Sequence, residues 1–155
     1  MKSSLPFALI AATLVMFLTP SARSAEALDA DVFGRYSGFL RASGPNRYSS
    51  AFQLSFTPTL QFSVNYRIGR IAVREVYQFS TIGTFVGSAR ARGRLLVTSS
   101  GTWSNTARMI RAAGTARTQN GRKFKVSTRI DFGAGTIQTL TRDRSGVVRA
   151  SGVKS

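Results

Sequence analysis

The sequence from residue 52 to residue 68 reads FQLSFTPTLQFSVNYRI, and it alternates strictly between two kinds of side chain. Apart from Pro58, the even-numbered positions carry large apolar or aromatic residues, and the odd-numbered positions are all polar. Successive side chains of a β-strand point to opposite faces of the sheet, so this alternation predicts strands with one buried face. Proline cannot donate a hydrogen bond to a neighbouring strand. We therefore expect two strands, separated at Pro58.

Similar short segments, punctuated by turn signals, fill the chain from residue 32 onwards. A first strand is predicted at residues 33–42, a tight turn at residues 69–70, and two short strands at residues 136–141 and 146–150 around a turn at 143–146. Many short strands joined by turns are typical of an all-β domain. The fold we expect is an antiparallel meander of about ten strands, arranged as a small up-and-down barrel or a sandwich.

The Asn-Gly pair at residues 120–121 predicts a hairpin whose register can be tested on the sequence. A two-residue loop would set Phe124 opposite Arg117 and mix apolar and basic groups on one face. A three-residue loop of residues 119–121 sets Phe124 opposite Ala116 and separates an apolar face from a basic one. Burial of the apolar face should select the second register, with Gly in the left-handed position of the loop.

The apolar positions change from odd to even numbers between Trp103 and Ile110. An extra residue in one strand produces such a change of face, so we expect a β-bulge near residues 109–110.

Basic residues recur at every second position within residues 84–97, which read TFVGSARARGRLLV. If this segment is one strand, Arg90, Arg92 and Arg94 lie in a row on one face. The hairpin around residues 119–121 carries a similar basic face. Arginine suits bidentate contacts with phosphate, sulfate or carboxylate groups. These outer faces are the predicted anion-binding surface, with candidate contacts Arg90, Arg92, Arg94, Arg111, Arg117, Lys123, Lys125 and Arg129.

The composition is strongly basic and lacks two chemically versatile residue types. The 155 residues include 22 Lys and Arg against 6 Asp and Glu, with no Cys and no His. Disulfides and zinc sites of the usual ligand types are thereby excluded, as is a Ser-His-Asp triad. No phosphate-binding loop motif or acidic calcium loop occurs. We therefore expect no cofactor, no metal, no catalytic residues and no enzymatic activity.

The N-terminus has the layout of a secretory signal. Lys2 is followed by a mostly apolar run at residues 5–18, then Pro20 and a series of small residues. The run is shorter than the roughly 20 apolar residues of a spanning helix. We predict a cleaved signal peptide at residues 1–27, with cleavage between residues 25 and 27, and a single all-β domain at residues 28–155. No Cys follows the apolar run, so a lipid anchor is not expected, and the predicted location is the bacterial periplasm or the extracellular space.

Aromatic residues on the apolar faces suggest a second hypothesis. A closed barrel could enclose a small apolar ligand. Glu75 falls among these apolar positions, and a buried carboxylate requires a partner. Glu75 is interpreted either as a ligand-orienting or catalytic acid, or as an acid that is paired with a neighbouring arginine or turned out to solvent by a bulge. The residues that would line such a cavity are Phe52, Phe56, Phe62, Tyr66, Glu75, Tyr77 and Phe85.

Three functions therefore remain open at this point. The first is an exported, non-enzymatic protein that binds an anionic envelope component, such as a polysaccharide or lipid head groups, through its basic strand faces. The alternative is a β-barrel carrier of an apolar small molecule. The third is an outer-membrane barrel, which the frequent arginines and the short chain disfavour.

Overall fold

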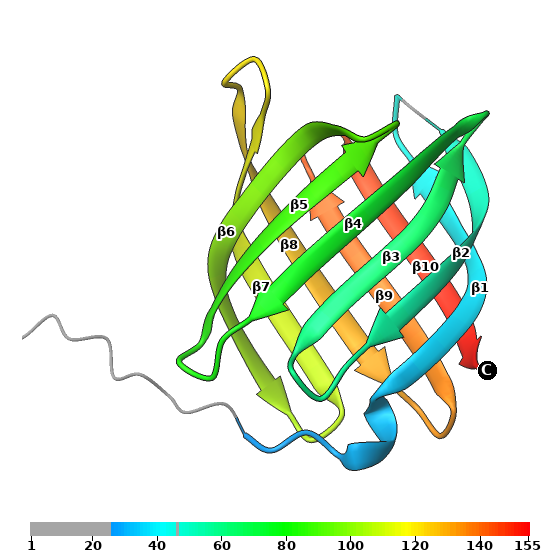
Figure 1. The fold of residues 1–155 in the computed structure, drawn as a ribbon, viewed down its shortest axis with the longest axis vertical. Coiled ribbons are helices and arrows are strands. Elements are labelled where there is room, and N and C mark those ends of the chain that lie inside the picture. The colour runs from blue at the N-terminus through cyan, green and yellow to red at the C-terminus, as the bar shows by residue number, and fades with distance from the viewer. Residues whose placement is uncertain (1–25, 46) are drawn as a thin grey trace, which may run out of the picture.

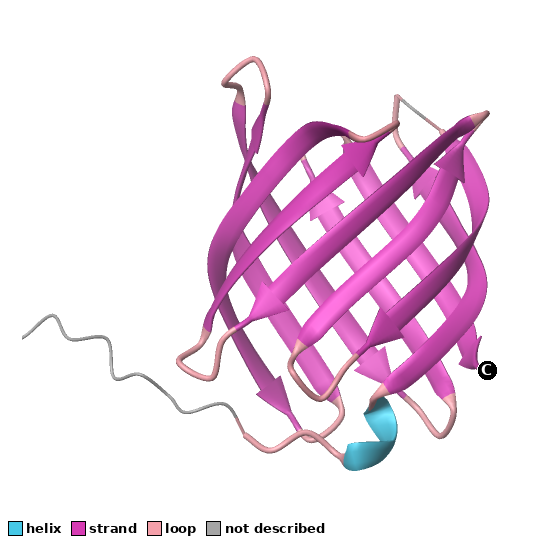
Figure 2. Ribbon diagram, in the orientation of Figure 1, coloured by secondary structure: helices cyan, strands magenta, loops and turns pink. Residues whose placement is uncertain are grey.

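The protein folds as a closed barrel of ten antiparallel strands, as the ribbon in Figure 1 shows. This computed structural model describes residues 26–45 and 47–155. Figure 2 shows that strands make up most of the described chain, with one short helical turn. The elements in chain order are η1 (Ala30–Val32), β1 (Gly34–Ser43), β2 (Tyr48–Phe56), β3 (Gln61–Ile68), β4 (Ile71–Phe79), β5 (Thr84–Ala91), β6 (Arg94–Thr106), β7 (Met109–Thr118), β8 (Lys123–Phe132), β9 (Thr136–Asp143) and β10 (Gly146–Lys154).

Each strand pairs with its neighbours in sequence, and the first strand closes the barrel on the last. On β1, Leu40 pairs with Ser50 of β2 on one side and with Ala150 of β10 on the other. This topology confirms the predicted meander and selects the barrel over the sandwich. The break at Pro58 is also confirmed, because β2 ends at Phe56 and β3 begins at Gln61.

The hairpin between β7 and β8 has the register that was predicted from burial of its apolar face. Phe124 pairs with Ala116, and Ile130 pairs with Ile110. Gly121 has a φ of 82°, which is the left-handed conformation that the three-residue loop requires. The loop is closed by a hydrogen bond from the Thr118 amide to the Arg122 carbonyl oxygen.

Two other sequence interpretations are wrong, and in both a tight hairpin was overlooked. Residues 84–97 do not form one strand: β5 ends at Ala91, Arg92 and Gly93 make a turn with φ values of 48° and 76°, and β6 begins at Arg94. The three arginines therefore do not share one strand face. The change of parity before Ile110 comes from the turn at residues 107–108, where β6 ends and β7 begins. The bulge lies elsewhere, in the β5–β6 pairing at Ala89 and Arg90.

The barrel has two distinct ends. At the lower end in Figure 1, η1 packs across the opening, and Val32 is 1% exposed. The Tyr36 hydroxyl donates a hydrogen bond of 2.7 Å to the Val32 carbonyl oxygen. Arg108 joins the same end through ion pairs to Asp29 and Asp31, at 2.7 and 2.6 Å. We call this the plugged end, and we call the opposite end, formed by the turns at 44–47, 69–70, 92–93, 119–122 and 144–145, the open end.

Aromatic side chains fill the barrel towards the plugged end. Phe56 lies against Phe62 and Phe132, with ring centroids 5.8 and 5.7 Å apart. Phe79 contacts Trp103 at 5.1 Å, and the Trp103 indole N–H donates to the Ser80 carbonyl oxygen at 2.8 Å. This aromatic core fills the barrel interior towards the plugged end and leaves the interior near the open end to be lined by other side chains.

The outer wall carries mainly polar side chains. Outward positions on β6, for example, are Thr98, Ser100, Thr102 and Ser104, all of them exposed. A barrel that spans a bilayer has the reverse arrangement, with an apolar outer band and a polar interior. The described wall therefore does not support the outer-membrane hypothesis.

The predicted signal peptide at residues 1–27 lies almost entirely outside the described residues. Within the described ranges, no helix is both long and apolar enough to cross a membrane.

Candidate functional site

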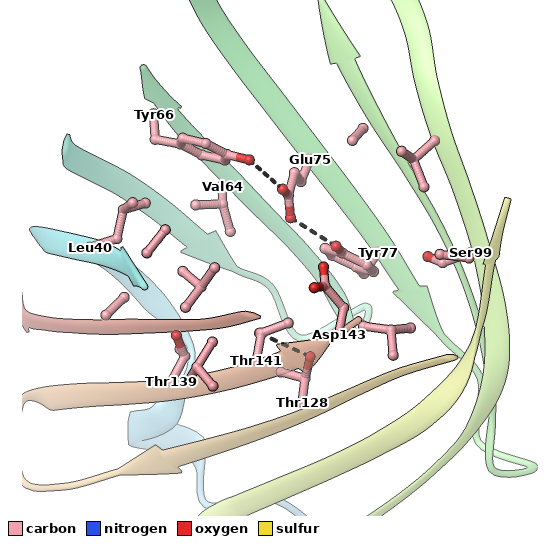
Figure 3. Close-up of a pocket in the computed structure, with 18 of the residues that line it drawn as sticks. Leu40, Val64, Tyr66, Glu75, Tyr77, Ser99, Thr128, Thr139, Thr141 and Asp143 are labelled. Carbon is pink, nitrogen blue, oxygen red and sulfur yellow. Dashed lines mark hydrogen bonds between the residues drawn. The ribbon is translucent and has the colours of Figure 1, made fainter. Parts of the chain in front are cut away.

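A cavity of about 670 Å³ occupies the barrel between the aromatic core and the open end. Its wall combines apolar side chains from most strands with a smaller polar set, and Figure 3 shows part of it. Ligand-binding cavities commonly have volumes of about 300–1,000 Å³ and this mixed lining. The polar side chains that line it are Ser43, Arg47, Tyr48, Tyr66, Glu75, Tyr77, Ser88, Ser99, Thr128, Thr139, Thr141, Asp143 and Ser145.

Glu75 is the centre of this polar set. Its strand position places the side chain inward, between Val64 of β3 and Ala89 of β5. The Tyr66 hydroxyl donates to Oε1 at 2.7 Å, and the Tyr77 hydroxyl donates to Oε2 at 2.8 Å (Figure 3). Each carboxylate oxygen thus accepts one hydrogen bond and keeps further capacity to accept.

The two phenols are held in their neutral, donating form. Burial raises the pKa of Tyr66 well above its ordinary value, and the nearby Glu75 carboxylate raises it further. The pKa of Tyr77 is raised by the same two causes in the same order. Both phenols therefore remain donors to Glu75 throughout the neutral range.

This arrangement differs in part from the sequence interpretation of Glu75. The side chain points into the barrel, as the alternation of β4 implies. Its partners are two tyrosines instead of an arginine, and among the described residues no ion pair involves Glu75. Tyrosine hydroxyls satisfy the carboxylate without neutralising its charge, so a net negative group faces the cavity when Glu75 is ionised.

Asp143 is a second acid on the cavity wall, and the sequence analysis missed it. Its Oδ1 accepts hydrogen bonds from the amide and the hydroxyl of Ser145, both at 2.6 Å, and from the Gly146 amide at 3.1 Å. That oxygen therefore holds the β9–β10 turn. The signal was present in the parity of β9, where Ile137 and Thr141 share the inward face with Asp143.

A pair of threonines adds neutral polar groups on the neighbouring strands. Thr128 and Thr141 are directly opposite each other on β8 and β9, and their hydroxyls are 3.0 Å apart (Figure 3). The sequence analysis did not single them out, because threonine is common on both faces of strands.

The structure distributes the predicted cavity residues over two regions. Six of them line the cavity, namely Phe52, Phe62, Tyr66, Glu75, Tyr77 and Phe85. Phe56 instead lies in the aromatic core nearer the plugged end, where it is 1% exposed and contacts Phe33. Parity gives the face of a residue but not its depth along the barrel axis.

The predicted anion-binding residues are likewise separated. All eight are exposed. Arg92, Arg94, Arg117 and Lys123 lie in or beside the turns of the open end, whereas Arg90, Arg111, Lys125 and Arg129 lie along the strands of the outer wall. Arg129 is engaged by Asp131, with an N–O distance of 2.8 Å.

The described part of the chain holds no group of three or more acidic, His or Cys residues that could bind a metal ion. The comparisons with known proteins add no further constraint: no protein-family model matches the chain, and no curated protein matches its sequence.

Proposed function

We propose that the barrel binds a mainly apolar small molecule that presents a cationic or hydrogen-bond-donating group to Glu75. The observation that carries this proposal is the inward-facing Glu75 carboxylate, held by two tyrosine donors inside a cavity of about 670 Å³. With the predicted export signal, such a protein would act as a small-molecule carrier of the bacterial envelope.

The distribution of charge supports a cationic group on the ligand. The chain has 22 basic and 6 acidic residues, yet the charged residues on the cavity wall are two acids, Glu75 and Asp143, and one arginine, Arg47. The cavity thus reverses the sign of the protein as a whole. A carboxylate in an enclosed site is costly unless it is paired, and a ligand cation or donor would complete the pairing that the two phenols begin.

A fluorescence titration tests whether the cavity binds apolar molecules. We expect the neutral probe N-phenyl-1-naphthylamine to bind saturably and to be displaced by decylamine. Val64→Phe and Ala89→Phe place an aromatic ring in the cavity and should weaken probe binding. Val86→Phe, at an exposed position of the outer wall, is the matched control. Absence of probe binding, or equal binding by the cavity variants and the control, would overturn the proposal.

The role of Glu75 is tested by comparing amphiphiles with the same tail. Decylamine should displace the probe better than decanol or decanoate does. Glu75→Gln should lower the affinity for decylamine by roughly tenfold or more, because a hydrogen bond to a charged group contributes about 1.5–3 kcal/mol. The affinity of the same variant for decanol should change little. If decylamine binds the variant and the original protein equally, the cavity binds apolar molecules but Glu75 does not select them.

A second function is favoured by a row of cations on the outer wall. Successive pairings place Arg111, Arg129, Leu140, Arg149 and Arg41 side by side across β7, β8, β9, β10 and β1. We propose that this row binds an anionic polymer of the envelope. Retention on an immobilised acidic polysaccharide should fall steeply with salt, and a salt-independent interaction would contradict this function.

A further inference from the structure

Every turn of the open end carries an arginine. The five turns join β1 to β2, β3 to β4, β5 to β6, β7 to β8 and β9 to β10, and they lie together at the upper end of the barrel in Figure 1. The up-and-down topology places them there although they are far apart in the sequence. We call these residues the rim arginines: Arg47, Arg70, Arg92, Arg122 and Arg144.

The rim arginines are unpaired in the described structure. All five are exposed, and among the described residues none of their guanidinium groups makes an ion pair or a hydrogen bond. The plugged end differs, because the one arginine in its described turns, Arg108, is paired with Asp29 and Asp31. The turns of the open end therefore carry unpaired positive charge that is available to an external partner, whereas the described turns of the plugged end do not.

Apolar side chains are exposed at the same end. Ile68 and Ile71 flank the β3–β4 turn and are 40% and 38% exposed. Leu96 lies beside the β5–β6 turn and is 40% exposed. Arginines mixed with exposed aliphatic residues are characteristic of surfaces that bind the interface of a lipid bilayer.

We propose that the open end docks on the surface of a bilayer containing anionic lipids. The rim arginines contact the head groups, while Ile68, Ile71 and Leu96 enter the boundary between head groups and acyl chains. In this orientation the cavity mouth, where Arg47 lies, faces the bilayer. The docking surface does not depend on the proposed ligand of the cavity.

The aliphatic residues favour a lipid surface over an anionic polymer. A polysaccharide or nucleic acid would use the arginines but gains little from Ile68 and Ile71. An anionic polymer is better matched by the row of arginines on the outer wall. The two surfaces can therefore be separated by mutation.

Vesicle co-sedimentation of the purified protein tests the docking surface. The rim variant changes Arg70, Arg92, Arg122 and Arg144 to Gln. The wall variant changes Arg41, Arg74, Arg111 and Arg149 to Gln and removes the same charge from exposed strand positions. Thermal unfolding of both variants verifies that each is folded.

We expect the protein to bind vesicles of phosphatidylcholine mixed with phosphatidylglycerol, and to bind pure phosphatidylcholine far more weakly. Each rim arginine should contribute roughly fivefold to the affinity, so the rim variant should lose at least about a hundredfold, while the wall variant changes only a few-fold. Ile68→Ser with Ile71→Ser should weaken the binding that persists at high salt. Equal binding to both kinds of vesicle, or an equal loss in the rim and wall variants, would overturn the proposal.

Discussion

At Tyr66 and Tyr77, burial and the Glu75 carboxylate act in the same direction on the phenol pKa. The pKa of Tyr36 and Tyr48 is also raised, with burial again the main cause. All four tyrosines of the chain therefore ionise at higher pH in the folded state than the ordinary value of 10.0. A raised folded-state pKa contributes stability that is complete below the unfolded pKa and is lost as pH rises.

The consequence is a loss of stability that begins near pH 10. There the unfolded chain releases phenol protons that the folded barrel retains, so the free energy of unfolding should fall with increasing pH. Phenolate absorbance of the folded protein should appear late and together with unfolding. Tyr66→Phe with Tyr77→Phe should make the fall in stability shallower. A spectrophotometric titration with ordinary tyrosine behaviour at pH 10 would contradict this expectation.

Glu75 also shows how far single residues could be inferred from sequence. Strict alternation along β4 correctly placed its side chain inward. Its partners could not be inferred, because Tyr66 and Tyr77 were themselves assigned only to the apolar face. Asp143 was assigned to a turn, and it does hold the β9–β10 turn. It is also the last inward-facing position of β9, so it faces the cavity as well. The distances between side chains on different strands, and the depth of each side chain along the barrel axis, depend on the shear of the closed sheet. A local sequence pattern does not determine that shear.

At the scale of strands, β6 and β7 meet at a pair of opposed glycines. Gly101 pairs with Gly114 on the inward side of the wall. A Cβ at Gly101 would overlap the Ala113 carbonyl oxygen, and one at Gly114 would overlap that of Ser100. Neither Gly101 nor Gly114 is among the glycines with a positive φ. It is therefore the close approach of the two backbones that requires glycine at these positions.

Alanine at either position of this pair should therefore destabilise the barrel. Gly101→Ala and Gly114→Ala should each lower the free energy of unfolding by about 1–3 kcal/mol, the usual cost of overpacking. Gly133→Ala is the control, because its added Cβ would meet only the Thr136 side chain. Urea unfolding monitored by circular dichroism gives the comparison. Equal stability of the Gly101 and control variants would show that the wall relaxes at no cost.

Local patterns predicted two features of the strands correctly. The strong apolar alternation gave the break between β2 and β3 at Pro58, and the Asn-Gly pair gave the register of the β7–β8 hairpin. The missed turns, Arg92-Gly93 and Ala107-Arg108, have two residues each. The turn at Ala107-Arg108 moves the inward positions from odd to even numbers, which a bulge in a continuous strand would also do. At Arg92-Gly93 the bulge at Ala89 and Arg90 compensates this shift, so the odd-numbered positions stay inward. In both cases the local sequence resembles that of one strand, and only the long-range pairing reveals the hairpin.

At the scale of the whole molecule, the sequence has a net charge of +16, and none of the charged residues that the structure describes is buried. Like charges stand directly opposite each other in four strand pairings: Arg111 with Arg129, Arg117 with Lys123, Arg41 with Arg149 and Arg74 with Arg90. Such opposed charges are destabilising. Against them stand three ion pairs within the described residues, two of them made by Arg108.

Repulsion should therefore exceed attraction at low ionic strength, and salt should stabilise the fold. The Debye length falls to about 10 Å at 0.1 M salt, which screens the wider repulsion between arginines while leaving close pairs such as Arg129–Asp131 less affected. We expect the thermal midpoint to rise between low salt and physiological salt, and Arg74→Gln to raise it at low salt while reducing the salt dependence. A midpoint that falls on adding sodium chloride would mean that the Arg108 and Arg129 ion pairs outweigh the repulsion, and that the basic surfaces are stable without a bound anion.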